Sequence, residues 1–244
     1  MIHRSSIAPV AAVVATYLAV LVQVASAEVP VPAAASAVPA RHERFSYVRA
    51  VEGRREQVTV EVSARRDTQG AYLAYSWRSP EEDGDYRLDP ATFASSWSDV
   101  TTRGPTSVIR RVTNVISDTA VMKPDELVLT STGPFLERLR TIPFESLPKY
   151  RILFQGGPPN AAFTLSVAVV GKERIIVSGV GWDCWKLELG VGGVLGTLFG
   201  GMAGKTRYWF STDRRHVPVR TEGLTGMPGS PMAVMELESY EDFR

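Results

Sequence analysis

AAFTLSVAVVGKERIIVSGVGWDCWKLEL, residues 161–189, is the stretch that decides the fold class. Over its first ten residues, every second position is apolar: Phe163, Leu165, Val167 and Val169. Alternation with a period of two predicts a strand with one buried face. Two further strands are predicted over residues 174–180 and 183–189, with breaks at Gly171 and Gly179.

The same alternation continues on both sides of this stretch. The additional predicted strands cover residues 45–47, 56–65 and 71–78 before it, and 206–211, 216–222 and 232–240 after it. In residues 71–78, Leu73, Tyr75 and Trp77 share one face. Short connections favour antiparallel pairing. Strands that do not alternate with helices disfavour a parallel sheet.

The middle of the chain carries helix signals instead. Asp-Pro at residues 89–90 offers an N-cap carboxylate followed by a first-turn proline, with Phe93 and Trp97 one turn apart beyond it. Residues 106–117 repeat apolar side chains at helical spacing, although their β-branched side chains favour a strand. A third helix is predicted over residues 133–141, so the middle of the chain is expected to be helical.

The first 27 residues have the three parts of an export signal. Arg4 precedes an almost wholly apolar run over residues 7–24, and Ala-Ser-Ala at residues 25–27 fits the cleavage rule. The run is short for a membrane span, which needs about 20 residues, but a retained anchor stays open. No cysteine follows the cleavage point, which excludes lipid modification there. We expect a signal peptide over residues 1–27 and a mature protein that is soluble in the periplasm or outside the cell.

Composition limits the partners of the mature chain. The signal peptide holds one of the 27 basic residues and none of the 26 acidic ones, so the mature chain has no net charge. This disfavours nucleic-acid binding, which normally requires a basic excess or a basic face. Residues 28–41 are rich in Ala and Pro and predict a linker. The single Cys184 excludes an intramolecular disulfide and is expected to be a buried, inert thiol.

A glycine-rich segment, residues 190–204, is the most unusual part of the chain. It ends in Gly-Lys-Thr at residues 204–206, but Phe199 stands where a phosphate loop requires glycine. We therefore expect no nucleotide cofactor. The segment reads as an apolar hairpin loop with Leu198 and Phe199 at its tip. It either folds under the sheet or contacts a ligand, a membrane surface or a partner protein.

Catalytic and metal-binding patterns are missing from the sequence. His42 and His216 have no neighbouring ligands at metal-binding spacing, and no Gly-x-Ser-x-Gly motif occurs. The acids at residues 81–83 read as a solvated turn. We expect a protein that is not an enzyme and holds no metal or other cofactor.

The last third of the chain resembles a known family. The motifs are Asp183-Cys184-Trp185-Lys186-Leu187-Glu188, Trp209-x-Ser211-x-Asp213, Pro218-x-Arg220 and Leu237-x-Ser239-Tyr240. This order resembles an exported bacterial family, the domain of unknown function numbered 3108, which is similar to the half-barrels of periplasmic lipoprotein carriers of the LolA and LolB kind. The resemblance covers residues 160–241. It implies a curved antiparallel sheet around an apolar interior, with helices covering the opening, and no catalytic residue.

These observations predict an α+β fold dominated by β structure: residues 42–244 form a single half-barrel-like domain, a curved antiparallel sheet with helices covering its concave face. Where such a sheet is incompletely filled, aromatic side chains line a cavity for apolar ligands. The candidate ligand-binding residues are Tyr75, Trp77, Phe93, Trp97, Leu198, Phe199 and Trp209. The predicted function is non-catalytic binding of a lipid or other amphipathic envelope molecule, as in lipid or lipoprotein handling. The alternative is a structural or adaptor protein with a filled core and an apolar loop that docks an envelope protein.

Overall fold

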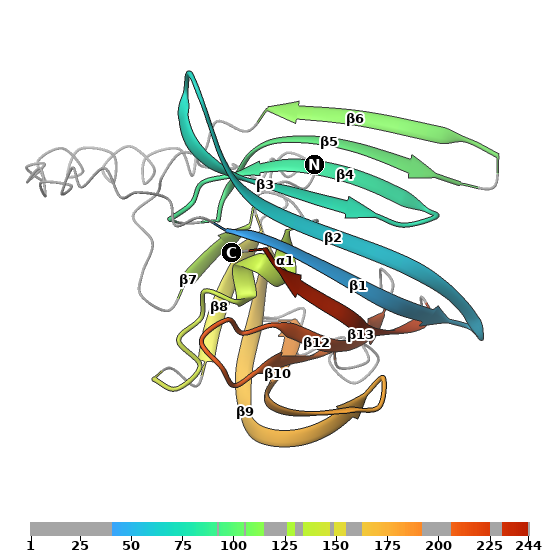
Figure 1. Cartoon of the computed structure of the whole chain (residues 1–244), viewed down its shortest axis with the longest axis vertical. Helices are drawn as coiled ribbons and strands as arrows, with labels where there is room; N and C mark the ends of the chain where they lie inside the picture. Colours follow the sequence, from blue (N-terminus) through green and yellow to red (C-terminus); the bar gives the residue numbers. More distant parts are fainter. Residues whose placement is uncertain are drawn as a thin grey trace, which may run out of the picture. The chain divides into compact units, whose positions relative to one another are not determined.

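The computed structural model describes residues 41–91, 93–104, 106–114, 126–129, 134–146, 149–154, 163–191, 206–224 and 231–243. They include a 13-stranded sheet (Figure 1). Its first six strands are β1 (His42–Val51), β2 (Arg54–Asp67), β3 (Gly70–Arg78), β4 (Glu82–Leu88), β5 (Ser95–Arg103) and β6 (Val108–Asn114). The others are β7 (Glu126–Leu129), β8 (Lys149–Phe154), β9 (Phe163–Val177), β10 (Val180–Val191), β11 (Thr206–Ser211), β12 (Pro218–Leu224) and β13 (Met232–Asp242), with helix α1 (Phe135–Leu139) between β7 and β8.

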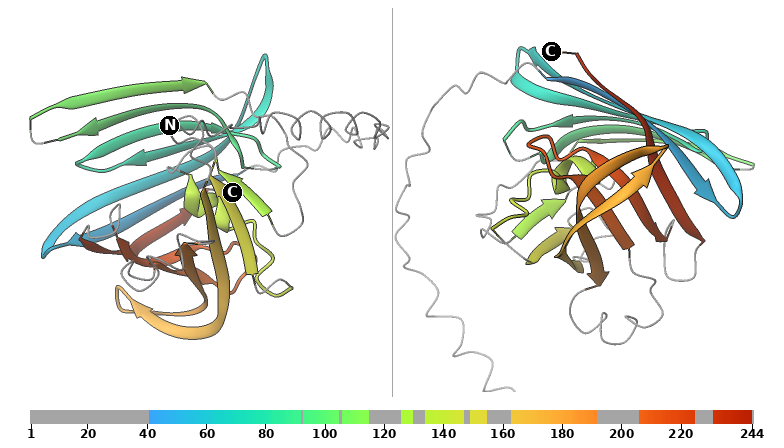
Figure 2. Two further views of the ribbon diagram at one scale, coloured as in Figure 1. Left: turned by 180° about the vertical axis from the view of Figure 1, so that it is seen from behind. Right: turned by 60° about the horizontal axis from the view of Figure 1, so that its bottom comes forward.

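The first and last strands meet in the middle of the sheet. β1 pairs with β13, β2 to β6 follow outward on one side, and β12 to β7 follow on the other (Figures 1 and 2). All neighbouring strands are antiparallel except β7 and β8, which are parallel. The two outermost strands, β6 and β7, are not paired with each other, so the described sheet is open.

Each strand alternates between two faces. We call the face that carries Tyr47, Val58 and Leu187 the inner face, because these side chains are almost completely buried. The opposite, outer face carries Glu61 and Arg220. The segment around α1 adds Leu136, Leu139, Ile142 and Phe144 to the core of the inner face. The alternation predicted for residues 56–65 and 71–78 is therefore confirmed in β2 and β3.

The prediction of helices covering a concave face is wrong. Residues 95–103 and 108–114, in the middle of the chain, are strands β5 and β6, and the one helix among the described residues has five residues. In residues 108–114, the described part of this segment that forms a strand, the β-branched side chains outweighed the helical spacing, because Val and Ile fit a pleated strand better than a helix. The antiparallel sheet was predicted correctly, whereas the helical part of the α+β class was not.

The Asp-Pro signal at residues 89–90 produces one turn rather than a helix. The Asp89 side chain accepts a hydrogen bond from the Ala91 N–H, and the Asp89 carbonyl accepts one from the Phe93 N–H. Phe93 then adopts a left-handed backbone conformation with φ of 57°, which ends the turn before β5 begins. The helix predicted over residues 133–141 exists, as the short α1.

One predicted strand break is a bulge instead. β9 runs without interruption from Phe163 to Val177, through Gly171, and its turn into β10 lies at Ser178 and Gly179. The register between β9 and β10 shifts by one residue between Val169 and Gly171, and Gly171 has a φ of 153°, which residues other than glycine rarely adopt. A glycine within strand patterning marks a bulge as readily as a turn.

Two predicted features lie outside the described residues. They are the export signal with its linker, residues 1–40, and the glycine-rich loop with Leu198 and Phe199. Among the residues that are described, no helix is long and apolar enough to cross a membrane.

Candidate functional site

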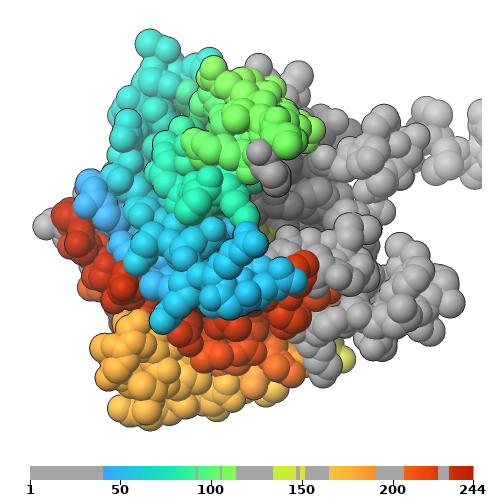
Figure 3. All heavy atoms as spheres, turned by 90° about the vertical axis from the view of Figure 1, so that its right-hand side faces the viewer, coloured from blue at the N-terminus to red at the C-terminus, as the bar shows by residue number. Residues whose placement is uncertain are grey.

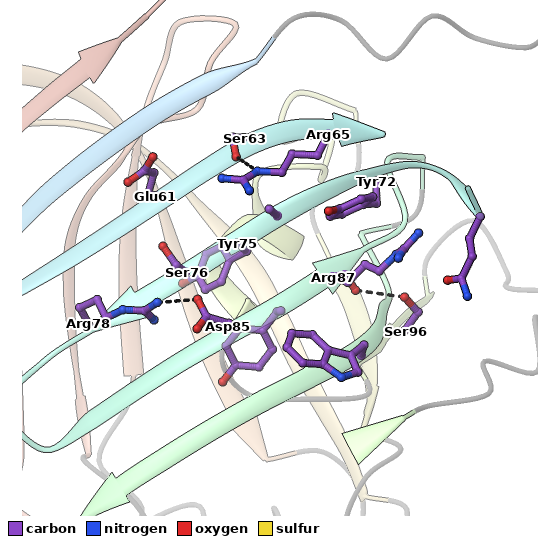
Figure 4. A pocket seen from close by; sticks show the side chains of 14 residues that line it. Glu61, Ser63, Arg65, Tyr72, Tyr75, Ser76, Arg78, Asp85, Arg87 and Ser96 are labelled. Carbon is purple, nitrogen blue, oxygen red and sulfur yellow. Dashed lines mark hydrogen bonds and ion pairs between the residues drawn. The ribbon is translucent and has the colours of Figure 1, made fainter. Parts of the chain in front are cut away.

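A hollow of about 710 Å³ lies over β2, β3, β4 and the start of β5 (Figure 4). We call it the outer hollow, because most of the side chains that line it belong to the outer face. Small side chains form its centre: Ser63 faces Ala74 across β2 and β3, and Ser76 is the next outer-face residue of β3. Longer side chains surround them, namely Glu61, Arg65, Tyr72, Arg78, Asp85, Arg87 and Trp97. The hollow thus arises from a difference in side-chain size on one face of a regular sheet.

Most charges around the outer hollow are paired. Arg78 donates to Asp85 at 2.6 Å. Arg87 binds both oxygens of Asp67 at 2.6 and 3.0 Å, and its guanidinium lies 4.1 Å from the centre of the Tyr72 ring. These bonds fix Arg87 over one face of Tyr72, so the aromatic side chain has a defined position.

Arg65 is different. Its guanidinium donates to the Ser63 hydroxyl at 3.2 Å, and it forms no ion pair with a carboxylate of any described residue. Glu61, an acid of β2 that also lines the hollow, pairs with His42 at 2.8 Å and Arg44 at 3.6 Å. The hydrogen bond from His42 is the main cause that lowers the pKa of Glu61. Within the described part of the chain, the outer hollow therefore holds one positive charge, Arg65, without a carboxylate partner.

A second, smaller hollow of about 320 Å³ lies on the inner face, and we call it the inner pocket. Its apolar wall comes from β3 in one half of the sheet, from β11 to β13 in the other half, and from α1. The residues are Trp77, Phe135, Leu136, Tyr208, Leu224, Ala233 and Met235. Phe135 and Tyr208 contact each other with ring centres 5.5 Å apart. The lining is mostly aromatic and aliphatic, as in pockets that bind small apolar ligands.

Two charged residues border this inner pocket. Arg49 is held by Glu56 and, at 2.8 Å, by Glu81. Burial raises the pKa of Glu82, against the opposing effects of the Arg49 charge and a hydrogen bond with Thr102. The pocket therefore combines an apolar wall with a polar margin.

The residues predicted to bind a ligand do not lie together at one site. Tyr75 and Trp97 border the outer hollow and Trp77 borders the inner pocket, whereas Leu198 and Phe199 lie outside the described residues. The Tyr75 ring is buried in the core against Tyr86, and its hydroxyl has no hydrogen-bond partner within the described part of the chain.

Phe93 and Trp209 border neither hollow. Phe93 packs beside the core, with the Arg41 guanidinium 5.7 Å from its ring centre. Trp209 is only 5% exposed on the outer face, where Lys186 and Arg220 lie over its ring and its Nε1 donates to Glu173. This tryptophan is therefore closely packed and is not part of either hollow.

A buried ionic cluster was not predicted. Arg140 donates to Glu43 at 3.0 Å, to Glu137 at 2.9 Å and to the Arg215 carbonyl at 2.7 Å. Burial alone would raise the pKa of Glu43, but the hydrogen bonds and charges of Arg140 and Arg41 hold it at about 2. The cluster ties α1 to β1 and to the turn between β11 and β12. Glu43 occupies an inner-face position of β1, and nothing in its alternation distinguishes it from a core residue.

The described residues include side chains of the types that bind metals or act as nucleophiles. No three His, Cys, Asp or Glu side chains among them lie close enough to hold a metal ion. Cys184 is fully buried, and burial raises the pKa of its thiol to about 12, as expected for an inert cysteine. His216 packs on the Phe144 ring with centres 4.5 Å apart, and its Nδ1 lies 3.2 Å from the Arg140 carbonyl.

No protein-family model matches the chain, and a search of curated proteins finds no relative. The family number suggested by the C-terminal motifs is therefore not confirmed. Solved structures similar to this chain include a β-barrel-like protein of the domain of unknown function 1849 from Brucella abortus, at 8% identity and a TM-score of 0.45, over 84% of this chain and 98% of that one. The hypothetical lipoprotein YmcC from Escherichia coli is similar at 12% identity and a TM-score of 0.34, over 81% and 84%. A LolA superfamily protein from Nitrosomonas europaea is similar at 9% identity and a TM-score of 0.22, over 83% and 85%.

Proposed function

We propose that this chain is an exported, non-catalytic protein of the cell envelope that binds an apolar or amphipathic ligand in the inner pocket. The observation that carries the proposal is the lining of that pocket by Trp77, Tyr208 and Met235 beside α1. Its volume, about 320 Å³, lies at the lower end of the 300–1,000 Å³ typical of ligand sites. Removing apolar ligand surface from water contributes about 25 cal/mol per Å², which favours an acyl chain over a polar ligand.

The margin of the pocket supports an amphipathic ligand. The Arg49 guanidinium and the Glu82 carboxyl border the same pocket as the apolar wall. A polar head group at this margin keeps hydrogen bonds while the apolar part is buried, which avoids an unpaired polar group.

Native mass spectrometry of protein purified without detergent tests this proposal. We expect co-purifying acyl species, which the substitution Ala233→Phe removes because the new ring fills the pocket. Val234→Phe is the matched control, since the neighbouring side chain lies on the outer face of β13. A wild-type protein free of ligand that also binds no fluorescent fatty acid would contradict the proposal, as would equal binding by the two variants.

The alternative function is a structural or adaptor role, and edge strand β6 is the observation that favours it. Val108, Ile109 and Val112 are 68%, 58% and 54% exposed, and β6 lies at the surface (Figure 3). An unpaired, apolar edge strand is a template for pairing with another chain. A ligand-free protein that elutes as a stable complex with an envelope protein, lost on Ile109→Lys, would favour the adaptor role.

Export is proposed from residues 1–27 alone. The mature protein is expected to begin at Glu28 and to appear in the soluble envelope fraction. Mass spectrometry of the N-terminus tests this, and an intact Met1 on a membrane-bound species would indicate a retained anchor.

A further inference from the structure

We propose that the outer hollow is a second binding site, and that its ligand is an anionic saccharide: a chain of hydroxyl-rich rings that carries a carboxylate. The site is separate from the inner pocket, because the two are lined by different residues. It does not depend on the function proposed above. Three properties of the outer hollow support this ligand class.

The first property is its polarity. Ser63, Ser76 and Ser96 place hydroxyl groups around the hollow, and guanidinium and carboxylate groups surround them (Figure 4). Hydroxyls both donate and accept hydrogen bonds, whereas guanidinium groups only donate and carboxylates only accept. This mixture matches a ligand whose own groups are hydroxyls. An acyl chain offers these groups neither a donor nor an acceptor and would remove them from water, which disfavours a lipid tail here.

The second property is the charge of Arg65, which no described carboxylate balances. Arg78 and Arg87 are already paired with Asp85 and Asp67. A ligand carboxylate at Arg65 would complete the pairing of the arginines in the hollow. Charge-assisted bonds of this kind are stronger than neutral ones.

The third property is a pair of aromatic side chains. Trp97, on β5, is half-buried and lies opposite Arg87 on β4. The guanidinium of the same arginine covers one face of the Tyr72 ring. Each ring combines a flat apolar surface with a polar group. The C–H face of a sugar ring can lie on such a surface while its hydroxyls reach the serines. The volume of about 710 Å³ falls within the range of ligand sites.

Calorimetric titration with trigalacturonic acid, and with its uncharged methyl ester, tests the proposal. We expect the acid to bind at least about tenfold more tightly than the ester, as a charge-assisted hydrogen bond implies. Arg65→Gln should remove this preference for the acid, and Trp97→Ala should weaken the binding of both the acid and the ester. Arg66→Gln is the matched control, because Arg66 follows directly in β2 and points to the opposite face.

Three results would overturn the proposal. They are absence of binding at millimolar trigalacturonic acid, equal losses in Arg65→Gln and Arg66→Gln, and equally tight binding of triglutamate, which carries carboxylates without sugar rings. Circular dichroism confirms that each variant is folded, which is expected because Arg65 and Arg66 are both exposed.

Discussion

The outer face of the sheet differs between its two halves. Around Trp209, across β10 to β13, it is filled: Trp209 lies beneath Lys186 and Arg220, and Arg220 also pairs with Glu236 at 2.8 Å. Over β2 to β5 the corresponding face is hollow, and the half-buried Trp97 stands beside small side chains. The same strand geometry therefore produces a closed surface in one half and an open one in the other.

Side-chain size and charge pairing explain this difference. Around Trp209 the long side chains of neighbouring strands meet above the ring, and each charge finds an opposite charge, such as Lys186 with Glu173 at 3.3 Å. Around Ala74 the side chain opposite on β2 is the short Ser63, and Arg65 has no carboxylate partner among the described residues. A face whose charged groups are paired with one another offers no free partner to a ligand. An open face with an unpaired charge does offer one.

The two tryptophans provide the largest expected contrast. Trp209→Ala should lower the free energy of unfolding by about 3–5 kcal/mol, because it removes a nearly buried ring and leaves a cavity. Trp97→Ala should lower it by less than about 1 kcal/mol, since the ring borders an open hollow. Urea unfolding of both variants gives these values. Equal losses would show that the outer hollow is as closely packed as the surroundings of Trp209.

The buried cluster beneath β1 contrasts with the exposed Arg65, because its charges are enclosed and paired. The pKa of Glu43 falls from 4.5 to about 2 on folding, which corresponds to about 3 kcal/mol of stability. A lowered carboxyl pKa stabilises the fold above pH 4.5, and this contribution is lost as the pH falls from 4.5 toward 2. We expect the stability difference between the wild type and Glu43→Gln to shrink across that range.

Arg65→Gln is the control for this pH series. Its stability should follow that of the wild type from neutral pH down to pH 2, because Arg65 forms no ion pair with a described carboxylate. Urea midpoints at several pH values provide the measurement. A constant difference between the wild type and Glu43→Gln would refute the assignment of a low pKa to Glu43.

The sequence predicted those strands whose two faces differ in polarity. β2 and β9 to β13 have buried and solvated faces, so their alternation was readable. The strand β6 was not predicted, because both of its faces are exposed at the edge of the sheet and its apolar residues follow no period of two. Gly171 was predicted to break the strand but lies at a bulge within it. A bulge and a turn both favour glycine, so the residue type alone does not distinguish them.

The candidate sites were less predictable than the strands. Trp77 and Trp97 were identified because they are aromatic, and each borders a hollow. Ser63, Ala74 and Arg65 could not be identified, because they form a site only through the register between β2 and β3. Register depends on pairing partners and turns, which residue type alone does not specify.

The smallest expected effects come from one substitution placed on the two faces of neighbouring strands. Ala64 lies on the inner face against the core, so Ala64→Leu should destabilise the fold by about 1–3 kcal/mol through overpacking. Ala74 lies at the centre of the outer hollow, where an added side chain meets open space, so Ala74→Leu should change stability by no more than about 0.5 kcal/mol. Thermal unfolding in parallel measures both values, and the same Ala74→Leu protein should lose binding of trigalacturonic acid. If Ala74→Leu proves as destabilising as Ala64→Leu, the outer hollow is closed in solution and the two halves of the outer face are alike.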